Sequence, residues 1–487
     1  MIPPVAADST IPLPPFSPGG PPARDPDAAM QQTPAAGPYP IDLVLFAALL
    51  GLLGFGIVMV YSASAVYAQQ KFGAADYFLK RDLAYAALGL AAMHYAARRD
   101  YGGWRKQAYP LLGVTIALLV AVLLFGARIN GARRWFHLGP LSFQPAELAK
   151  LSLVIYLARS LAQKMSAQKV KSFAVGFVPH MAVAGLMMLL LLKQPDLGTA
   201  VILGLTTLML LFVAGAKVSY LVLAFLGAAP IVYQAIVGTP WRLRRILAYI
   251  DPWPYRYDVG YQITESLISI GSGGLFGLGL GDGKQKLFFL PEAHTDYILA
   301  IVGEELGLVG LLCIAATFVL LVWRGARAAF RARDAFGCYL AFGITAVIAL
   351  QAAVNLGVVL GALPTKGLPL PFVSFGGSTL VVDLFAAGIL LNISRGAPEP
   401  IPRAFPSLWR RLVSGGKANR RLRGGGRRVV IVTDDQPAPP SLTTAGDRIF
   451  NGSEIVPADI TLREREGTSG GPEITLRDLT PREEGSA

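Results

Sequence analysis

The sequence is poor in the residue types from which soluble enzymes build polar sites. It has two cysteines and four histidines, and only 15% of its 487 residues are charged, against roughly 25% in soluble domains. Cys313 and Cys338 lie in or beside apolar runs, which argues against a disulfide framework and against a cysteine-ligated zinc site. Because neither a P-loop nor a zinc-finger spacing occurs, the sequence indicates neither an ATP-driven pump nor a nucleic-acid-binding protein.

Long apolar runs take the place of the missing charge. Hydrophobic residues make up 53% of the chain, and the mean hydropathy is +0.49. A helix that crosses a bilayer needs about 20 mostly apolar residues. Such helices are expected at 41–62, 82–97, 108–126, 146–161, 174–192, 198–216, 218–237, 296–323, 336–361 and 372–394. The sequence therefore predicts an all-α polytopic membrane protein of about ten transmembrane helices.

The chain divides into three parts by composition. Residues 1–40 are rich in Pro and Ala and predict a disordered leader. Residues 41–397 hold the apolar runs, with a long connection at 238–295 between the seventh and eighth spans. Residues 398–487 predict a basic, mostly disordered tail with one candidate strand, Val429–Val432. Lys and Arg gather after the second, fourth and eighth spans and in this tail, so both termini are expected in the cytoplasm.

The opposite, extracytoplasmic side is not depleted of basic residues as that rule expects. Its candidate anion-binding side chains are Arg133, Arg134, Arg242, Arg245 and Lys366. An anionic ligand would explain them, and contact with anionic lipid headgroups would explain them equally well. Ser374 stands where the last span is expected to begin, and backbone N–H groups there could bind a phosphate.

Two carboxylates precede the eighth span. Pro291 predicts the start of a helix, and Glu292 would then lie in a first turn, where the helix dipole alone could explain it. Asp296 would lie one turn further, at the mouth of the apolar run, where an acidic residue is costly without a function or a partner. Small residues on the same predicted face, including Gly303 and Gly307, would turn Asp296 toward a crevice between helices. A capping or ion-paired aspartate is the alternative.

The remaining acidic residues have structural explanations at least as good as functional ones. Glu147 is expected to pair with one of the outer arginines, and Asp196 to cap the sixth span. Glu304, Glu305 and Asp383 lie within spans, where they could form a polar pathway or buried structural pairs. Before them, Tyr261–Ile270 predicts an amphipathic or re-entrant helix, followed by a glycine-rich segment that allows tight turns.

Several motifs occur in a specific order along residues 41–397. They read GARRWFHLG, QPAELAKL, QPDLGTA, DPW, GYQITESLISIGSGGLFGLGLG, LPEAHTDYI, GEELG and LPTKGLPLPFVSFGGS. The ordered set resembles the SEDS family (shape, elongation, division and sporulation), the polytopic glycosyltransferases of bacterial cell-wall synthesis. LPEAHTD and TKGLPLP resemble the FtsW-type division branch more than the RodA-type elongation branch. Glu265 and Asp383 depart from the family pattern.

The resemblance implies a peptidoglycan glycosyltransferase that polymerises lipid II, an undecaprenyl-pyrophosphate disaccharide-pentapeptide. The family's catalytic aspartate maps onto Asp296. The resemblance also implies a place at the division septum in the bacterial inner membrane, with a class B penicillin-binding protein and other divisome membrane proteins as partners. A lipid II flippase and a non-catalytic scaffold for that penicillin-binding protein are the alternatives.

The chemistry of this reaction assigns roles to the outer residues. An inverting glycosyl transfer needs a base opposite the leaving group, which is the role expected of Asp296. Pyrophosphate leaves readily, but its developing charge needs cations in a partly dry site. The predicted substrate-binding residues are Arg133, Arg134, Arg242, Arg245, Glu292, Lys366 and Ser374. No metal site is predicted from these residues, although a divalent cation, Mg²⁺ or Mn²⁺, could assist the pyrophosphate.

Overall fold

The computed structural model describes residues 41–129, 131–139, 141–163, 170, 172–396, 429–432 and 448–451. The predicted leader at 1–40 and most of the predicted tail at 398–487 lie outside the described residues. The chain divides into two compact units, 1–413 and 414–487. In the second unit, β4 (Val429–Val432) pairs in parallel with β5 (Arg448–Asn451), so the candidate strand is confirmed.

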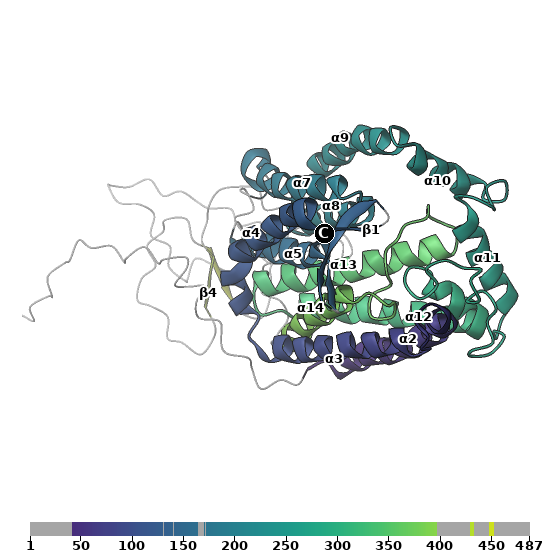
Figure 1. The fold of residues 1–487 in the computed structure, drawn as a ribbon. Coiled ribbons are helices and arrows are strands. Elements are labelled where there is room, and N and C mark those ends of the chain that lie inside the picture. Colours follow the sequence, from purple (N-terminus) through teal and green to yellow (C-terminus); the bar gives the residue numbers. More distant parts are fainter. Residues whose placement is uncertain are drawn as a thin grey trace, which may run out of the picture. The chain divides into compact units, whose positions relative to one another are not determined.

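Each of the ten predicted spans corresponds to a helix in the first unit (Figure 1). They are α2 (Leu43–Phe72), α3 (Tyr77–Arg98), α4 (Gly102–Phe125), α5 (Pro145–Gln163), α7 (Val178–Lys193), α8 (Leu197–Val213), α9 (Val218–Val237), α12 (Ile298–Phe330), α13 (Ala335–Val359) and α14 (Ser378–Ser394). Among the described residues, five of these helices are long and apolar enough to cross a membrane by themselves. They are α2, α4, α12, α13 and α7, the last counted together with the π-helical turn Phe173–Phe177 before it. The prediction of a polytopic helical protein with about ten spans is confirmed.

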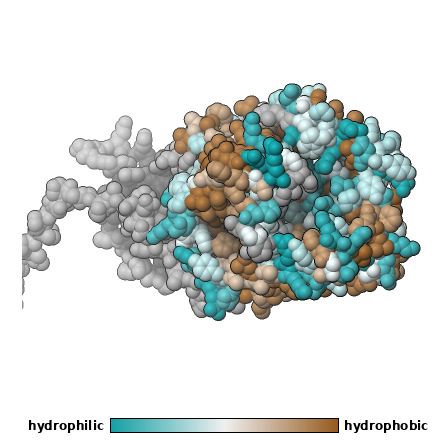
Figure 2. Space-filling model, in the orientation of Figure 1, coloured by the Kyte–Doolittle hydropathy of each residue, from teal (hydrophilic) through white to brown (hydrophobic). Residues whose placement is uncertain are grey.

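Helices α5, α13 and α14 form the centre of the bundle. Nearly every residue of α5 is buried, and α14 packs along α3 while α13 packs on α5 and α12. In contrast, α9 buries none of its described side chains and lies with α10 along one edge, across the view from α2 and α3 (Figure 1). Figure 2 shows broad hydrophobic areas on the surface, as expected for helices that face lipid.

Polar contacts at one end of the bundle join segments that are far apart in sequence. Arg324 of α12 forms an ion pair with Asp42, the N-cap of α2, at 2.7 Å, and the Asp42 N–H donates to the Ser394 hydroxyl at the end of α14. Tyr101, before α4, donates to Asp334, before α13. The connections after the second and eighth spans therefore lie at the same end as the start of the first span and the end of the tenth.

The other end carries the irregular connections. β1 (Ala127–Ile129), β2 (Ala132–Leu138) and β3 (Leu141–Phe143) form a three-stranded antiparallel sheet between α4 and α5, where a loop was predicted. The long connection after α9 contains α10 (Pro240–Ile250) and α11 (Tyr261–Gly273). The predicted short helix at Tyr261–Ile270 is therefore confirmed.

The glycine-rich segment after α11 inserts beside a break in α12. The break is at Gly307, which has φ 67° and ψ −164°. The Leu278 N–H donates to the Glu304 carbonyl at 2.9 Å, and the Leu308 N–H donates to the Gly274 carbonyl at 2.9 Å. A Cβ on Gly307 would lie 2.4 Å from the Gly277 nitrogen. The broken helix thus keeps its backbone hydrogen-bonded, which a membrane-embedded segment requires.

The two glutamates of the GEELG motif anchor this segment. Glu304 accepts hydrogen bonds from the Lys284 N–H at 2.7 Å and from the Gln285 N–H. Glu305 forms an ion pair with Lys286 at 2.8 Å, with both side chains buried, and accepts from the Ser62 hydroxyl. Of the two sequence-based explanations, these contacts support buried structural pairs.

Candidate active site

Asp296 lies in a turn before α12, and the predicted helix start at Pro291 is wrong. Residues 291–297 form turns, and α12 begins at Ile298. Glu292 has a positive φ of 56°, and its carbonyl accepts from the N–H groups of both Thr295 and Tyr297. The φ of Glu292 is incompatible with a right-handed helix. The prediction that a helix dipole stabilises its carboxylate is therefore wrong. Its exposed carboxylate instead accepts from the Thr295 hydroxyl at 3.0 Å.

The Asp296 side chain lies against the connection between α13 and α14. Asn355 of α13 donates from Nδ2 to the Asp296 carbonyl at 2.8 Å. A Cβ built on Gly367 would lie 2.7 Å from Asp296 Oδ2, so a side chain at this position would displace the carboxylate. Asp296 is half-buried and faces protein at this point.

The surroundings of Asp296 hold its carboxyl group near the midpoint of its titration at neutral pH. Burial raises the pKa of Asp296 to about 7, and the negative charge of Glu292 adds to the rise. The positive charges of Arg134 and Arg245 oppose it. A carboxylate with a pKa near the working pH suits general base catalysis.

Two of the predicted basic residues, Arg134 and Arg245, act on this carboxylate, and both also act on Lys366. Arg134 of β2 donates to the carbonyl oxygens of Gln194 and Pro195 at 2.8 and 2.6 Å. The guanidinium group of Arg245 lies 5.2 Å from the Trp241 ring centre on α10. Burial lowers the pKa of Lys366 to about 8, an effect that Asp196 opposes and that Arg242, Arg245 and Arg134 strengthen. The positive charges of these three arginines therefore act directly on the ammonium group of Lys366.

Arg133 and Ser374 lie differently. Successive side chains on a strand point to opposite faces, and Arg133 donates to the Leu123 and Leu124 carbonyls at the end of α4. Ser374 is buried and accepts from the Leu370 N–H at 2.9 Å. Because α14 begins at Ser378, the predicted position of Ser374 at a helix start is wrong. Neither side chain is hydrogen-bonded to Asp296, although the Phe375 N–H, next to Ser374, donates to the His294 carbonyl at 3.0 Å.

Asp196 caps α8 as predicted. Its Oδ1 accepts from the Thr199 N–H at 3.1 Å, and its charge also stabilises the protonated form of Lys366. The cap thus has a second effect, since its negative charge opposes the loss of the Lys366 charge that burial favours.

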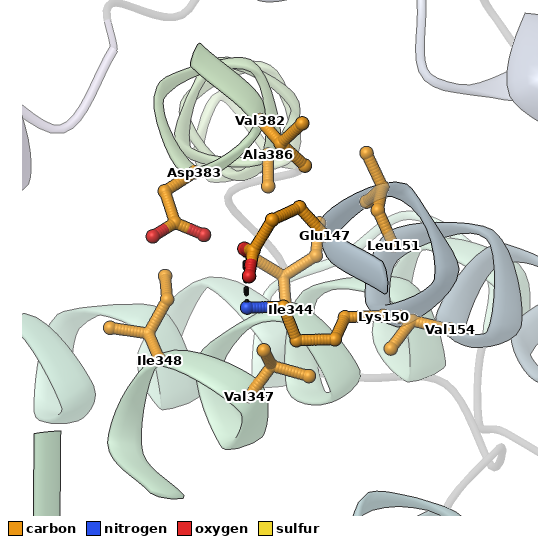
Figure 3. Close-up of a pocket in the computed structure, with 10 residues that line it drawn as sticks. All are labelled: Glu147, Lys150, Leu151, Val154, Ile344, Val347, Ile348, Val382, Asp383 and Ala386. Carbon is orange, nitrogen blue, oxygen red and sulfur yellow. Dashed lines mark ion pairs between the residues drawn. The ribbon is translucent and has the colours of Figure 1, made fainter. Parts of the chain in front are cut away.

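A second polar cluster lies among α5, α13 and α14 (Figure 3). Glu147 forms an ion pair with Lys150, one turn along α5, at 2.6 Å, so the predicted pairing with an outer arginine is wrong. Figure 3 shows the Asp383 carboxylate on the facing side of a small cavity of about 20 Å³ that both α5 residues line. A volume of this size holds about one water molecule.

The acidic groups at the site could hold a metal ion only with help from a substrate. Within the part of the chain that the structure describes, no three His, Cys, Asp or Glu side chains are grouped as metal ligands. Mg²⁺ is commonly held by one or two carboxylates together with substrate phosphates. Asp296 and Glu292 are the carboxylates nearest in sequence to such a site, and Mg²⁺ or Mn²⁺ there stays a prediction.

Sequence reasoning missed Asn355 and Gly367. An amide within an apolar span is unusual enough to mark Asn355 as a candidate. Gly367 carries no comparable signal, because its contact with Asp296 depends on how two distant segments meet.

Fold and site together define a polytopic membrane protein with a carboxylate and a group of cations gathered at one end of its helix bundle. The profile of the FtsW/RodA/SpoVE family, described as "Cell cycle protein", matches residues 43–398. The chain is similar to the probable peptidoglycan glycosyltransferase FtsW of Geobacter sulfurreducens, with 49% identity over 73% of this chain and 96% of that protein. It is also similar to stage V sporulation protein E of Bacillus subtilis, with 43% identity over 73% and 97%.

Two solved structures share the fold. One, described under "Structural coordination of polymerization and crosslinking by a peptidoglycan synthase complex", has a TM-score of 0.62 and 29% identity, covering 73% of this chain and 98% of the other. The other, the Thermus thermophilus rod shape determining protein RodA, has a TM-score of 0.55 and 29% identity, covering 73% and 97%. The chain belongs to the FtsW/RodA/SpoVE family, the SEDS family of the sequence-based prediction, and its relatives confirm the FtsW-type assignment.

Proposed function

We propose that this protein is a peptidoglycan glycosyltransferase that polymerises lipid II into glycan strands during septal cell-wall synthesis. The observation that carries the proposal is the Asp296 carboxylate, with its pKa raised to about 7, in the electrostatic reach of Arg134 and Arg245. The similarity to a probable peptidoglycan glycosyltransferase of Geobacter sulfurreducens supports the same reaction.

In the proposed reaction, Asp296 accepts the proton of the acceptor sugar 4-hydroxyl. The oxygen attacks the donor anomeric carbon with inversion, and the bond from that carbon to the lipid diphosphate breaks. Glycosidases need a second carboxyl group to protonate a poor leaving group. A diphosphate leaves without protonation, so a single carboxylate near the reacting atoms is sufficient.

The cations stabilise the charge that develops on the departing diphosphate. The positive charges of three arginines act on Lys366, namely Arg134, Arg242 and Arg245. Two of them, Arg134 and Arg245, also act on Asp296. Preorganised charges of this kind act more strongly in a partly dry site than in water. A diphosphate beside Lys366 would also raise its pKa again and keep it charged, because an anion favours the ammonium form.

The other predicted substrate-binding residues take lesser roles. Glu292 lies exposed at the rim and raises the pKa of Asp296 by its like charge. Ser374 stabilises the connection that carries Lys366, through its hydrogen bond with Leu370. Arg133 stabilises the end of α4. A divalent cation could screen the diphosphate, and the roles proposed for these residues do not depend on one.

The active-site end is proposed to face the extracytoplasmic space. The basic connections that meet at the other end of the bundle favour the cytoplasm by the positive-inside rule, and both termini would follow them. An impermeant thiol reagent tests this in a Cys313→Ala, Cys338→Ala background. Tyr257→Cys, at a residue that is 90% exposed, should react in intact spheroplasts, whereas Arg99→Cys should react only after lysis. The reverse pattern would place the site in the cytoplasm.

The similarity to a peptidoglycan synthase complex supports a transpeptidase partner. We propose a class B penicillin-binding protein, acting with this chain and other divisome membrane proteins at the septum of the bacterial inner membrane. The polymerase would then produce the glycan strand that its partner crosslinks.

The test is polymerisation of lipid II by the purified protein with its partner. Asp296→Asn should reduce the rate of glycan synthesis about 10²- to 10⁴-fold while the protein remains folded, because it removes the general base. Asp251→Asn, which changes an exposed carboxylate at the end of α10, is the matched control and should retain activity. Near-normal synthesis by folded Asp296→Asn would remove Asp296 as the base.

The same preparation separates the two alternatives. Transfer of lipid II across vesicle membranes without polymerisation would indicate a flippase. The protein would be a scaffold if it recruits the penicillin-binding protein but makes no glycan, either alone or in complex with that partner.

A further inference from the structure

We propose that Asn355 is a positioning residue that holds the turn that carries Asp296 at a fixed position relative to the turn that carries Lys366. The inference rests on the proposed function, because it concerns the geometry of the same site. Asn355 lies in the last turns of α13 and is 2% exposed.

The Asn355 amide joins two segments that are distant in sequence. Nδ2 donates to the Asp296 carbonyl at 2.8 Å and to the Leu368 carbonyl at 2.7 Å. Both amide hydrogens are therefore used, one on each side of the site. Because both neighbours are acceptors, only the NH₂ group can face them, which fixes the orientation of the amide.

The Leu368 carbonyl belongs to the turn that carries Lys366. The Leu368 N–H donates to the Lys366 carbonyl at 3.1 Å, so these residues form a tight three-residue turn. Gly367, between them, is the residue that approaches the Asp296 carboxylate. Fixing Leu368 thus fixes the backbone of the turn that carries Lys366 relative to the turn that carries Asp296.

The side chain of Leu368 gives the turn a second support. It packs against Gly198 in the first turn of α8, where an added Cβ would lie 3.2 Å from the leucine side chain. The N-cap of α8, Asp196, interacts electrostatically with Lys366. Asn355 therefore connects α13 to the turn before α12 and to the turn that packs on α8.

The oxygen of the same amide destabilises the folded protein, which an apolar side chain at this position would not do. Asn355 Oδ1 is buried and has no hydrogen-bond partner among the residues that the structure describes, and an unsatisfied buried polar group is destabilising. An apolar side chain of similar shape would remove this cost, but it would leave the two carbonyls unanchored. We infer that the two donated hydrogen bonds, and the geometry that they impose, account for this residue.

The variant that tests the proposal is Asn355→Leu, which keeps a similar shape and removes both donors. We expect kcat for lipid II polymerisation to fall about 30- to 100-fold with KM within about 3-fold, because a misplacement of about 1 Å costs roughly 10²-fold in rate. The acidic limb of the pH–rate profile should also move below about 7, since a loosened site admits water to the carboxylate. Asn355→Ser, which keeps one donor, should give an intermediate kcat.

Asn392→Leu is the matched control. Asn392 is also a buried amide, and it donates to the Ala97 carbonyl at 2.9 Å and accepts from the Tyr101 N–H at the other end of the bundle. This variant should lower the unfolding temperature while kcat and the pH profile stay as in the wild type.

Three results have distinct meanings in one assay that includes Asp296→Asn. Inactive Asp296→Asn, together with the expected loss in both Asn355 variants, supports the positioning role. If Asp296→Asn is inactive but folded Asn355→Leu or Asn355→Ser keeps the wild-type kcat and acidic limb, the positioning role is wrong and the proposed function stands. If Asp296→Asn is active, Asp296 is not the base, and the positioning role that rests on it is overturned as well.

Discussion

Replacing Asp296 by Asn should stabilise the protein at alkaline pH while it slows polymerisation about 10²- to 10⁴-fold. The pKa of Asp296 is raised from an ordinary value of 3.8 to about 7, so the folded state binds this proton more tightly than the unfolded chain does. The stability that this carboxyl group contributes is fully present below about pH 4 and is lost as the pH rises through about 7. An asparagine has no such loss.

The magnitude follows from the distance between the two pKa values. The interval from 3.8 to about 7 corresponds to at most about 4 kcal/mol, since one pH unit is about 1.4 kcal/mol. Asp296 is only half-buried, so solvent screening reduces the effect, and we expect about 1–2 kcal/mol. The unfolding temperature of Asp296→Asn, relative to the wild type, should therefore rise by a few degrees between pH 5 and pH 8.

Thermal unfolding of the purified proteins in nanodiscs at these two pH values measures this difference. Asp251→Asn, with the same change of charge at an exposed position, should show an unfolding temperature difference that does not depend on pH. If the difference between Asp296→Asn and the wild type is the same at pH 5 and pH 8, the carboxylate is not held at a raised pKa and the reasoning fails.

Other predictions concern the cations. Burial lowers the pKa of Lys366 in the free protein to about 8, so kcat/KM for polymerisation by the wild type should decline above about pH 8. Lys366→Arg should retain its kcat/KM there because a guanidinium group stays charged. Arg134→Ala should reduce the polymerisation rate and move the acidic limb to higher pH, since Arg134 lowers the pKa of the catalytic carboxylate, whereas Arg133→Ala should change only the unfolding temperature. Lys286→Met should reduce the free energy of unfolding in urea by about 3–5 kcal/mol, because it leaves a buried carboxylate unpaired, whereas Lys80→Met, which removes an exposed ion pair, should have little effect.

The helices could be predicted from sequence because the bilayer imposes a local rule. Apolar runs of about 20 residues predict spans whatever their neighbours are, and all ten predicted spans are helices in the structure. The break at Gly307 could not be predicted in this way. It exists because the chain at Gly277 approaches α12 too closely for a side chain, and that approach is a property of the folded protein.

At the site, too, features set by local sequence could be predicted, and features set by tertiary structure could not. Asp296 was proposed from its place before an apolar run and from family motifs, and Lys366 from its place in a Pro/Gly loop. The different positions of Arg133 and Arg134 follow from the alternation of side chains on β2, a strand that the sequence analysis did not predict. The helix predicted at Pro291 was wrong because the turn at Glu292 adopts a positive φ, a choice dictated by tertiary structure.

The pH dependence of lipid II polymerisation tests most directly whether the ionised carboxylate of Asp296 is the base. For the wild type with its partner, the rate should rise with pH through about 7, and the residual rate of Asp296→Asn should lack this acidic limb. An acidic limb of unchanged position in Asp296→Asn would contradict the account, because another group would then accept the proton.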